Sequence, residues 1–366
     1  MAFKISPIKE FGTFGVYVDN VDMDHMTDDD WLELGQLAVE KLVIVFRNIN
    51  MSKGQYADWI PKWGPLKADL RARFRRKYGQ DFDALKPETW EGIDGVDRTW
   101  LETRGNALEA VDDGSGRHLT RIYGGKDGQG KMMGAFAYGE LYWHSNESSS
   151  LTFSPMVSLL GWEEMHNSCT GFVQTIDYYE SLSDSFRREL NDMIVVHGYK
   201  AGFVNDNEHT DEVFSAHVKM SFCPDEGTET PLVCVAPNGR KGLHYTVNSA
   251  VKIKGMSDNE SKKLFTRLDH ELFTSENIFD HHYAVGSKDL LVFDNSVTLH
   301  RRVGGEPGRK AFRMQFDISP LIDKPWRPFL AHPEYDKEYV EKTHDLVNLV
   351  GGDLGERFKL PSRGVN

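Results

Sequence analysis

Cysteine is scarce in this chain of 366 residues, and its scarcity argues against a scaffold held by disulfides. The three cysteines, Cys169, Cys223 and Cys234, are too few and odd in number for a disulfide framework, which favours a reducing compartment. No apolar run approaches the roughly 18 residues of a membrane-spanning helix, and the first residues lack the apolar stretch of a signal peptide. We therefore expect a cytoplasmic protein without a membrane partner.

Positive charge is also in short supply. Lys and Arg number 43 against 56 Asp and Glu, which gives a net charge of −13 and argues against nucleic acid as a partner. The glycine-rich loops that cradle nucleotide phosphates are missing as well. What remains is an ordinary globular composition, with 39% hydrophobic and 27% charged residues, long enough to bury a large core. We expect a small-molecule substrate, and homo-oligomerisation stays open.

Many short strands and a few helices are predicted. Thr27 is a suitable N-cap for one helix, Ser183 for a second that runs to Met193, and Ser257 and Glu260 form a capping box for a third. Apolar runs predict strands over residues 42–46, 232–235, 243–247, 290–294 and 311–318. This pattern favours a mainly β fold, a double-sheet jelly roll with flanking helices.

Two segments stand apart from that pattern. Residues 64–130 are rich in Gly and Asp and predict an irregular insert that serves as a lid. Residues 326–366 are polar, and we expect them to form a C-terminal extension packed on the outside of a single domain, residues 1–325. The lid begins with a basic stretch, which is either a solvated face or a surface for an anionic substrate or partner. The stretch covers residues 62–77, and its basic residues are Lys62, Lys67, Arg71, Arg73, Arg75, Arg76 and Lys77.

Two histidines lie in motifs with the character of a metal site. His144 stands in Trp-His-Ser-Asn, with Asn146 two residues later, and His300 closes the run that begins with Asp294 and Asn295. Two histidines and one carboxylate on a common face are the ligands of non-haem Fe(II) oxygenases. Residues i and i+2 of a strand share a face, so a strand through this motif predicts Asn146 rather than Glu147 as the third ligand. Other histidines, such as His281, are expected to be structural.

Arginine residues follow the second histidine. Arg313 lies on a predicted strand and is suited to bind the far carboxylate of a keto acid whose other end chelates the metal, and Arg309 could assist it.

Together these motifs resemble the taurine dioxygenase/TfdA family of Fe(II)- and 2-oxoglutarate-dependent dioxygenases, over about residues 5–320. The family pattern Trp-His-x-Asp is similar to Trp143–Asn146, and its Asp-Asn-…-His run followed by arginine is similar to Asp294–His300 with Arg313. The resemblance implies a double-stranded β-helix (cupin-like) fold and Fe(II) held by His144, residue 146 and His300. It further implies 2-oxoglutarate bound by Arg313 and Thr170, and O₂ used to hydroxylate a C–H bond while succinate and CO₂ are released.

Asn146 departs from the family, which has Asp at this position, and four interpretations stay open. Asn146 could ligate iron in a working oxygenase, or leave the metal so that chloride enters, as in related halogenases. It could also be an engineered replacement, or mark a homologue that only binds. The substrate is not predicted beyond a small metabolite, for which the basic stretch is the one hint of an anionic group. Tyr138 and Glu140 are candidate substrate contacts beside the first motif.

Overall fold

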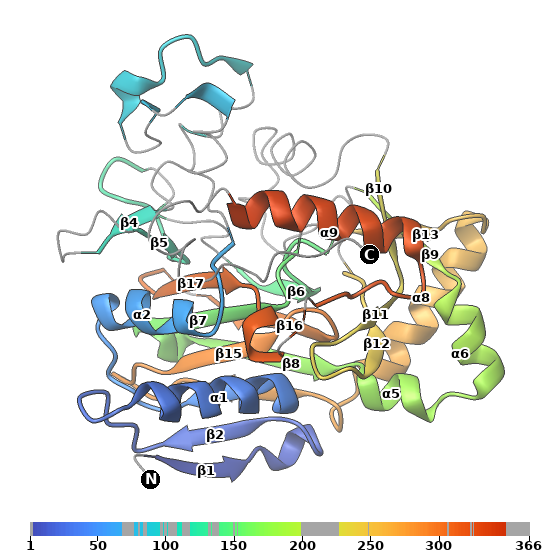
Figure 1. The fold of residues 1–366 in the computed structure, drawn as a ribbon, viewed down its shortest axis with the longest axis horizontal. Coiled ribbons are helices and arrows are strands. Elements are labelled where there is room, and N and C mark those ends of the chain that lie inside the picture. The colour runs from blue at the N-terminus through green and yellow to red at the C-terminus, as the bar shows by residue number, and fades with distance from the viewer. Residues whose placement is uncertain are drawn as a thin grey trace.

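Two sheets, antiparallel except for the parallel pairing of β2 with β3 in the larger one, form the centre of the molecule in the computed structural model (Figure 1). The structure describes residues 3–67, 77–79, 81–82, 86–95, 98, 101, 108–111, 118–130, 133, 139–148, 151, 153–198, 227–247, 249–305, 307–322, 324 and 326–348. Within these residues, the larger sheet has the strand order β1 (Lys4–Pro7), β2 (Val16–Asp19), β3 (Val43–Phe46), β15 (Leu290–Asp294), β7 (Met156–Glu163), β17 (Lys310–Phe316), β5 (His118–Arg121) and β4 (Leu108–Ala110).

A smaller sheet faces the larger one. Its order is β14 (Phe279–His282), β8 (Ser168–Gln174), β16 (Thr298–Gly304) and β6 (Leu141–His144). Alternation along the strands sends one set of side chains into the space between the sheets, where Phe293 from β15 meets Phe172 from β8. The adjacent residue on each strand points to the opposite face of its sheet: Val292 packs in the cluster outside the larger sheet and Val173 in the cluster outside the smaller one. This arrangement confirms the predicted mainly β jelly roll.

Helices cover the outer faces of both sheets. On the larger sheet lie α1 (Asp28–Lys41) and α2 (Lys53–Trp59), with Trp31 stacked on Trp63 at 4.4 Å between ring centroids. Beyond the smaller sheet Figure 1 shows α5 (Ile176–Ser181), α6 (Asp184–Asn191) and α8 (Asp258–Leu272) grouped together. Short strands join them: β9 (Ile194–His197), β10 (Thr228–Pro231), β13 (Ala250–Ile253), and the pair β11 (Val233–Val235) and β12 (Lys241–Leu243). The described 3-10 helices are η1 (Lys9–Phe11), η2 (Ile60–Lys62), η3 (Pro87–Thr89), η5 (Met165–Asn167) and η7 (Ser319–Ile322).

The predicted helix starts are confirmed. Thr27, Ser183 and Ser257 each accept a hydrogen bond from a backbone amide of the first turn, which satisfies a donor that the helix itself cannot. Several predicted boundaries are wrong; the strand predicted over residues 311–318, for example, ends at Phe316. The second helix ends at Asn191 rather than Met193, and residues 244–247 are not strand, because β12 ends at Leu243.

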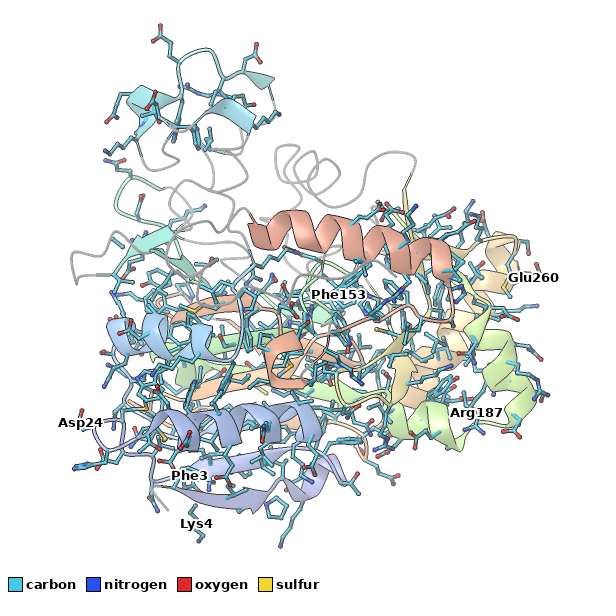
Figure 2. The ribbon with its side chains drawn as sticks, in the orientation of Figure 1. Phe3, Lys4, Asp24, Phe153, Arg187 and Glu260 are labelled. Carbon is cyan, nitrogen blue, oxygen red and sulfur yellow. The ribbon has the colours of Figure 1, made fainter. Side chains whose placement is uncertain are left out.

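The C-terminal segment is less peripheral than its polar composition predicts. Trp326 and Phe329 are buried with Tyr339 of α9 (Pro333–Asn348) against Phe153, which Figure 2 shows in the middle of the molecule below α9. The Trp326 indole donates to the carbonyl of Val235. These aromatic side chains therefore belong to the core cluster between the sheets and do not merely cover it.

The described helices include none that is both long and apolar enough to cross a membrane.

Candidate metal centre

His144 and His300 are cross-strand neighbours in the smaller sheet. They face each other in the register of β6 and β16, and their ring centroids are 4.1 Å apart at an angle of 44°. The outward neighbours Trp143 and Leu299 pack on the helical layer, so both imidazoles point into the space between the sheets. The structure thus brings together two histidines that lie far apart in the sequence.

Both imidazoles are in a form that can bind a metal. The Nδ1 of His144 donates to the carbonyl of Tyr142 at 2.7 Å, which places the proton on Nδ1 and leaves the Nε2 lone pair available. His300 packs on Phe293, and its buried Nδ1 has no hydrogen-bond partner among the described residues. Burial lowers the pKa of His144 to about 4, and burial and the neighbouring His144 hold the pKa of His300 well below its usual value. Both rings are therefore neutral at pH 7.

The third predicted ligand lies in a turn rather than on a strand. β6 ends at His144, and residues 145–148 form a turn in which Ser148 donates to the Ser145 carbonyl. The assumption of strand alternation at residue 146 is therefore wrong. The side chains nevertheless separate: Asn146 is buried and accepts a long hydrogen bond from Arg313 at 3.4 Å, whereas Glu147 forms an ion pair with Lys67.

Arg313 lies close to this group. Ala311, two residues earlier on β17, faces the space between the sheets, and alternation gives Arg313 the same direction. Burial lowers the pKa of the Arg313 guanidinium to about 10, and its charge in turn contributes to lowering the pKa of both histidines. No carboxylate within the described ranges forms an ion pair with it. A partly buried arginine of this kind is suited to hold an anion.

Thr170 and Arg309 belong to a second group of polar side chains. Both are related to Tyr283, a residue that the sequence did not indicate as part of the site. The Thr170 hydroxyl shares a hydrogen bond with the Tyr283 hydroxyl at 2.9 Å, deep in the core. Burial lowers the pKa of Arg309 to about 10, while the electrostatic influence of Tyr283 acts to raise it. The structure therefore associates Thr170 with Arg309, while Arg313 lies with the histidines. Sequence reasoning missed Tyr283 because its only link to Thr170 is tertiary.

The two candidate substrate contacts fare differently. Glu140 is exposed immediately before β6, and Tyr138 lies outside the described residues. Four arginines of the basic stretch, which lie between residues 68 and 76, are also outside the described residues. His281, expected to be structural, is buried, and its Nε2 shares a hydrogen bond with the Asp289 carboxylate at 3.0 Å.

The donor set fits a metal with a weak third ligand. In the part of the chain that is described, no three His, Cys, Asp or Glu residues converge on one point, as expected when position 146 carries an amide. Two neutral imidazoles facing one another, with the Asn146 amide in the adjoining turn, still offer nitrogen and oxygen donors suited to Fe(II). Paired histidines between the sheets of a jelly roll define the class of cupin-like metal-dependent enzymes.

The family follows from comparison with known proteins. Residues 4–315 match the taurine catabolism dioxygenase TauD, TfdA family, and the chain belongs to that family of 2-oxoglutarate-dependent dioxygenases. It is similar to pentalenolactone F synthase of Streptomyces arenae, with 26% identity over 200 residues, which span 52% of this chain and 64% of that protein. It is also similar to (S)-phenoxypropionate/alpha-ketoglutarate-dioxygenase of Sphingobium herbicidovorans, with 21% identity over 82% of this chain and 89% of the relative.

Solved structures share the fold. AAD-2 in complex with Mn(II) and N-oxalylglycine superposes with a TM-score of 0.57 at 19% identity, over 86% of this chain and 97% of AAD-2. A taurine dioxygenase from Burkholderia xenovorans gives a TM-score of 0.56 at 17% identity, over 86% and 89% of the two chains. The predicted family and its double-stranded β-helix fold are confirmed.

Proposed function

We propose that this chain is an Fe(II)- and 2-oxoglutarate-dependent oxygenase that hydroxylates a C–H bond of a small anionic metabolite. The observation that carries the proposal is the pair of neutral, facing imidazoles of His144 and His300 beside a partly buried, cationic Arg313. Family membership implies the cofactor: when bound, Fe(II) would supply the coupling of 2-oxoglutarate decarboxylation by O₂, with release of succinate and CO₂, to oxidation of the substrate.

Metal binding would use Nε2 of His144, His300 and the amide oxygen of Asn146. The hydrogen bond from Nδ1 of His144 to the Tyr142 carbonyl fixes the ring and its tautomer before the metal arrives. Asn146 would add a neutral oxygen, so it would cancel none of the charge on the metal. We therefore infer weaker Fe(II) binding than with a carboxylate at this position.

The buried Arg309 and the partly buried Arg313 suggest two anion sites. Arg309, near Tyr283 and hence near Thr170, would hold the distal carboxylate of 2-oxoglutarate, with the Thr170–Tyr283 pair able to donate a further hydrogen bond. Arg313, which contacts Asn146, would instead hold the anionic group of the substrate beside the metal. This assignment differs from the sequence-based one, which gave the 2-oxoglutarate carboxylate to Arg313, and it rests on which groups surround each guanidinium.

The proposal is tested by adding Fe(II) and 2-oxoglutarate under air and measuring succinate against a panel of carboxylate and sulfonate metabolites. Stimulated succinate together with a product 16 mass units heavier is expected for insertion of one oxygen atom. A chloride-dependent product would instead identify the halogenase alternative. No Fe(II) binding and no succinate with any substrate would overturn the proposal and leave a homologue that only binds.

A further inference from the structure

We propose that Asn295 is a positioning residue that fixes residue 146 in place beside His144 and His300. The inference rests on the proposed metal site, because its functional meaning is the placement of the third ligand. Asn295 lies directly after β15, on the loop that leads to β16 and His300. Its side chain is fully buried and reaches across to the turn that follows β6.

Asn295 hydrogen-bonds both backbone polar groups of residue 146. The amide of Asn146 donates to Oδ1 of Asn295 at 2.7 Å, and Nδ2 of Asn295 donates to the carbonyl of Asn146 at 3.0 Å. This pattern resembles one rung of an antiparallel ladder, supplied by a side chain where the strand has ended. The turn therefore gains at residue 146 the constraint that sheet pairing gives His144.

The side chain of Asn295, which we call the clamp because it holds both backbone polar groups of residue 146, is itself fixed in position. The second Nδ2 hydrogen of Asn295 is directed to the Ser154 carbonyl at 3.0 Å, and the backbone amide of Asn295 donates to the Pro155 carbonyl at 2.7 Å. On the other side, the Asp294 carboxylate accepts hydrogen bonds from the amides of Ser296 and Val297, which fixes the same loop. A side chain held at this many points can transmit its position to residue 146.

The turn depends on this contact at residue 146 in particular. Thr246 holds the neighbouring residue, since its hydroxyl accepts from the Ser145 amide at 3.2 Å. At Glu147 the backbone adopts φ 60°, a left-handed conformation that is unfavourable for glutamate. Removal of the Asn295 amide would leave a buried donor and a buried acceptor of residue 146 unpaired, which would favour opening of the turn at this residue.

Site-resolved hydrogen exchange of the metal-free protein tests the clamp. In Asn295→Ala the amide of residue 146 should exchange at least about tenfold faster, whereas the amide of Ser145, held by Thr246, should be unchanged. Asn295→Asp keeps the size and one acceptor but loses both donors, so it should show the same effect in part. Unchanged exchange at residue 146 in Asn295→Ala would overturn the clamp.

Titration with Co(II) alone tests the positioning role. Loss of a contact that orients a ligand typically weakens metal binding by about 10- to 100-fold, and the visible Co(II) spectrum should change with it. Asn277→Ala is the matched control, because Asn277 also donates through Nδ2 to two backbone carbonyls, those of Glu271 and Leu272, but at the end of α8. It should leave both readouts unchanged.

The outcomes separate the two proposals. Faster exchange at residue 146 with unchanged Co(II) affinity and spectrum would make Asn295 a purely structural residue and overturn the positioning role. If the native protein binds no Co(II), the proposed function fails, while hydrogen exchange still decides whether Asn295 clamps the turn.

Discussion

The Arg313 guanidinium donates a hydrogen bond to the side-chain oxygen of Asn146, so the proposed third ligand and a partly buried cation are direct neighbours. An aspartate at this position would meet the same guanidinium as an ion pair and would present a bound metal with a charged oxygen. In the proposed site, position 146 would thus be the point where metal charge, substrate charge and protein charge meet.

Asn146→Asp should strengthen metal binding. A carboxylate attracts Fe(II) or Co(II) far more than an amide does, although Arg313 offsets part of this gain, and we expect an increase of at least about tenfold in affinity. The measurement is Co(II) titration of both proteins, followed by succinate formation. An affinity equal to that of the native protein would show that residue 146 does not reach the metal.

Arg309→Lys and Arg313→Lys should affect different kinetic constants. Lysine keeps the charge but loses the paired hydrogen bonds of guanidinium, so each change should raise one KM by about 10- to 100-fold. For Arg309→Lys it is the KM for 2-oxoglutarate, and for Arg313→Lys the KM for the substrate. The two variants serve as controls for one another, and the reverse pattern would return the 2-oxoglutarate carboxylate to Arg313.

Acid should destabilise the protein in part through His244. This histidine is fully buried, stacks on Phe153 and uses Nδ1 to bond the Ser296 carbonyl, and burial lowers its pKa to about 4. A histidine whose folded pKa is depressed contributes its full stability above about pH 6.5, and this contribution is lost as the pH falls towards 4. The loss is on the order of 3 kcal/mol at the acid end.

His244→Phe should therefore flatten the dependence of the unfolding free energy on pH between 4 and 7, as measured by urea denaturation. Because Phe leaves the Ser296 carbonyl without its partner, stability at pH 7 should fall by about 1 kcal/mol. The buried histidines of the metal site titrate in the same direction and would retain part of the slope. A slope identical to that of the native protein would show that His244 is not protonated in this range.

Phe329→Ala should destabilise the whole domain. Its ring is buried in the core beside Phe153 and Tyr339, so truncation should cost about 3–5 kcal/mol. The adjacent Leu330 is 57% exposed, and Leu330→Ala should change stability by no more than about 0.5 kcal/mol. Equal effects of the two substitutions on urea unfolding would contradict the core role of the C-terminal segment.

Local patterns in the sequence predicted what local physics decides. The caps at Thr27 and Ser257 are short-range hydrogen bonds, and the inward direction of His300 follows from strand alternation. The turn after His144 could not be predicted in this way, because a side chain on a distant loop holds it. The Thr170–Tyr283 hydrogen bond could not be predicted for the same reason; the family resemblance suggested Thr170 and Arg313 as the 2-oxoglutarate contacts and gave no sign of Tyr283, whose charge influences the pKa of Arg309.

The two hydrogen bonds between Asn295 and residue 146 involve only the backbone of residue 146, so they do not depend on which side chain stands there. An evolving lineage could exchange that side chain without rebuilding the loop. The codons of asparagine and aspartate differ by a single base, so an ancestor with either ligand lies one mutation away from the other. The charge of the proposed metal site would therefore be open to selection, while the path of the chain around it stays fixed.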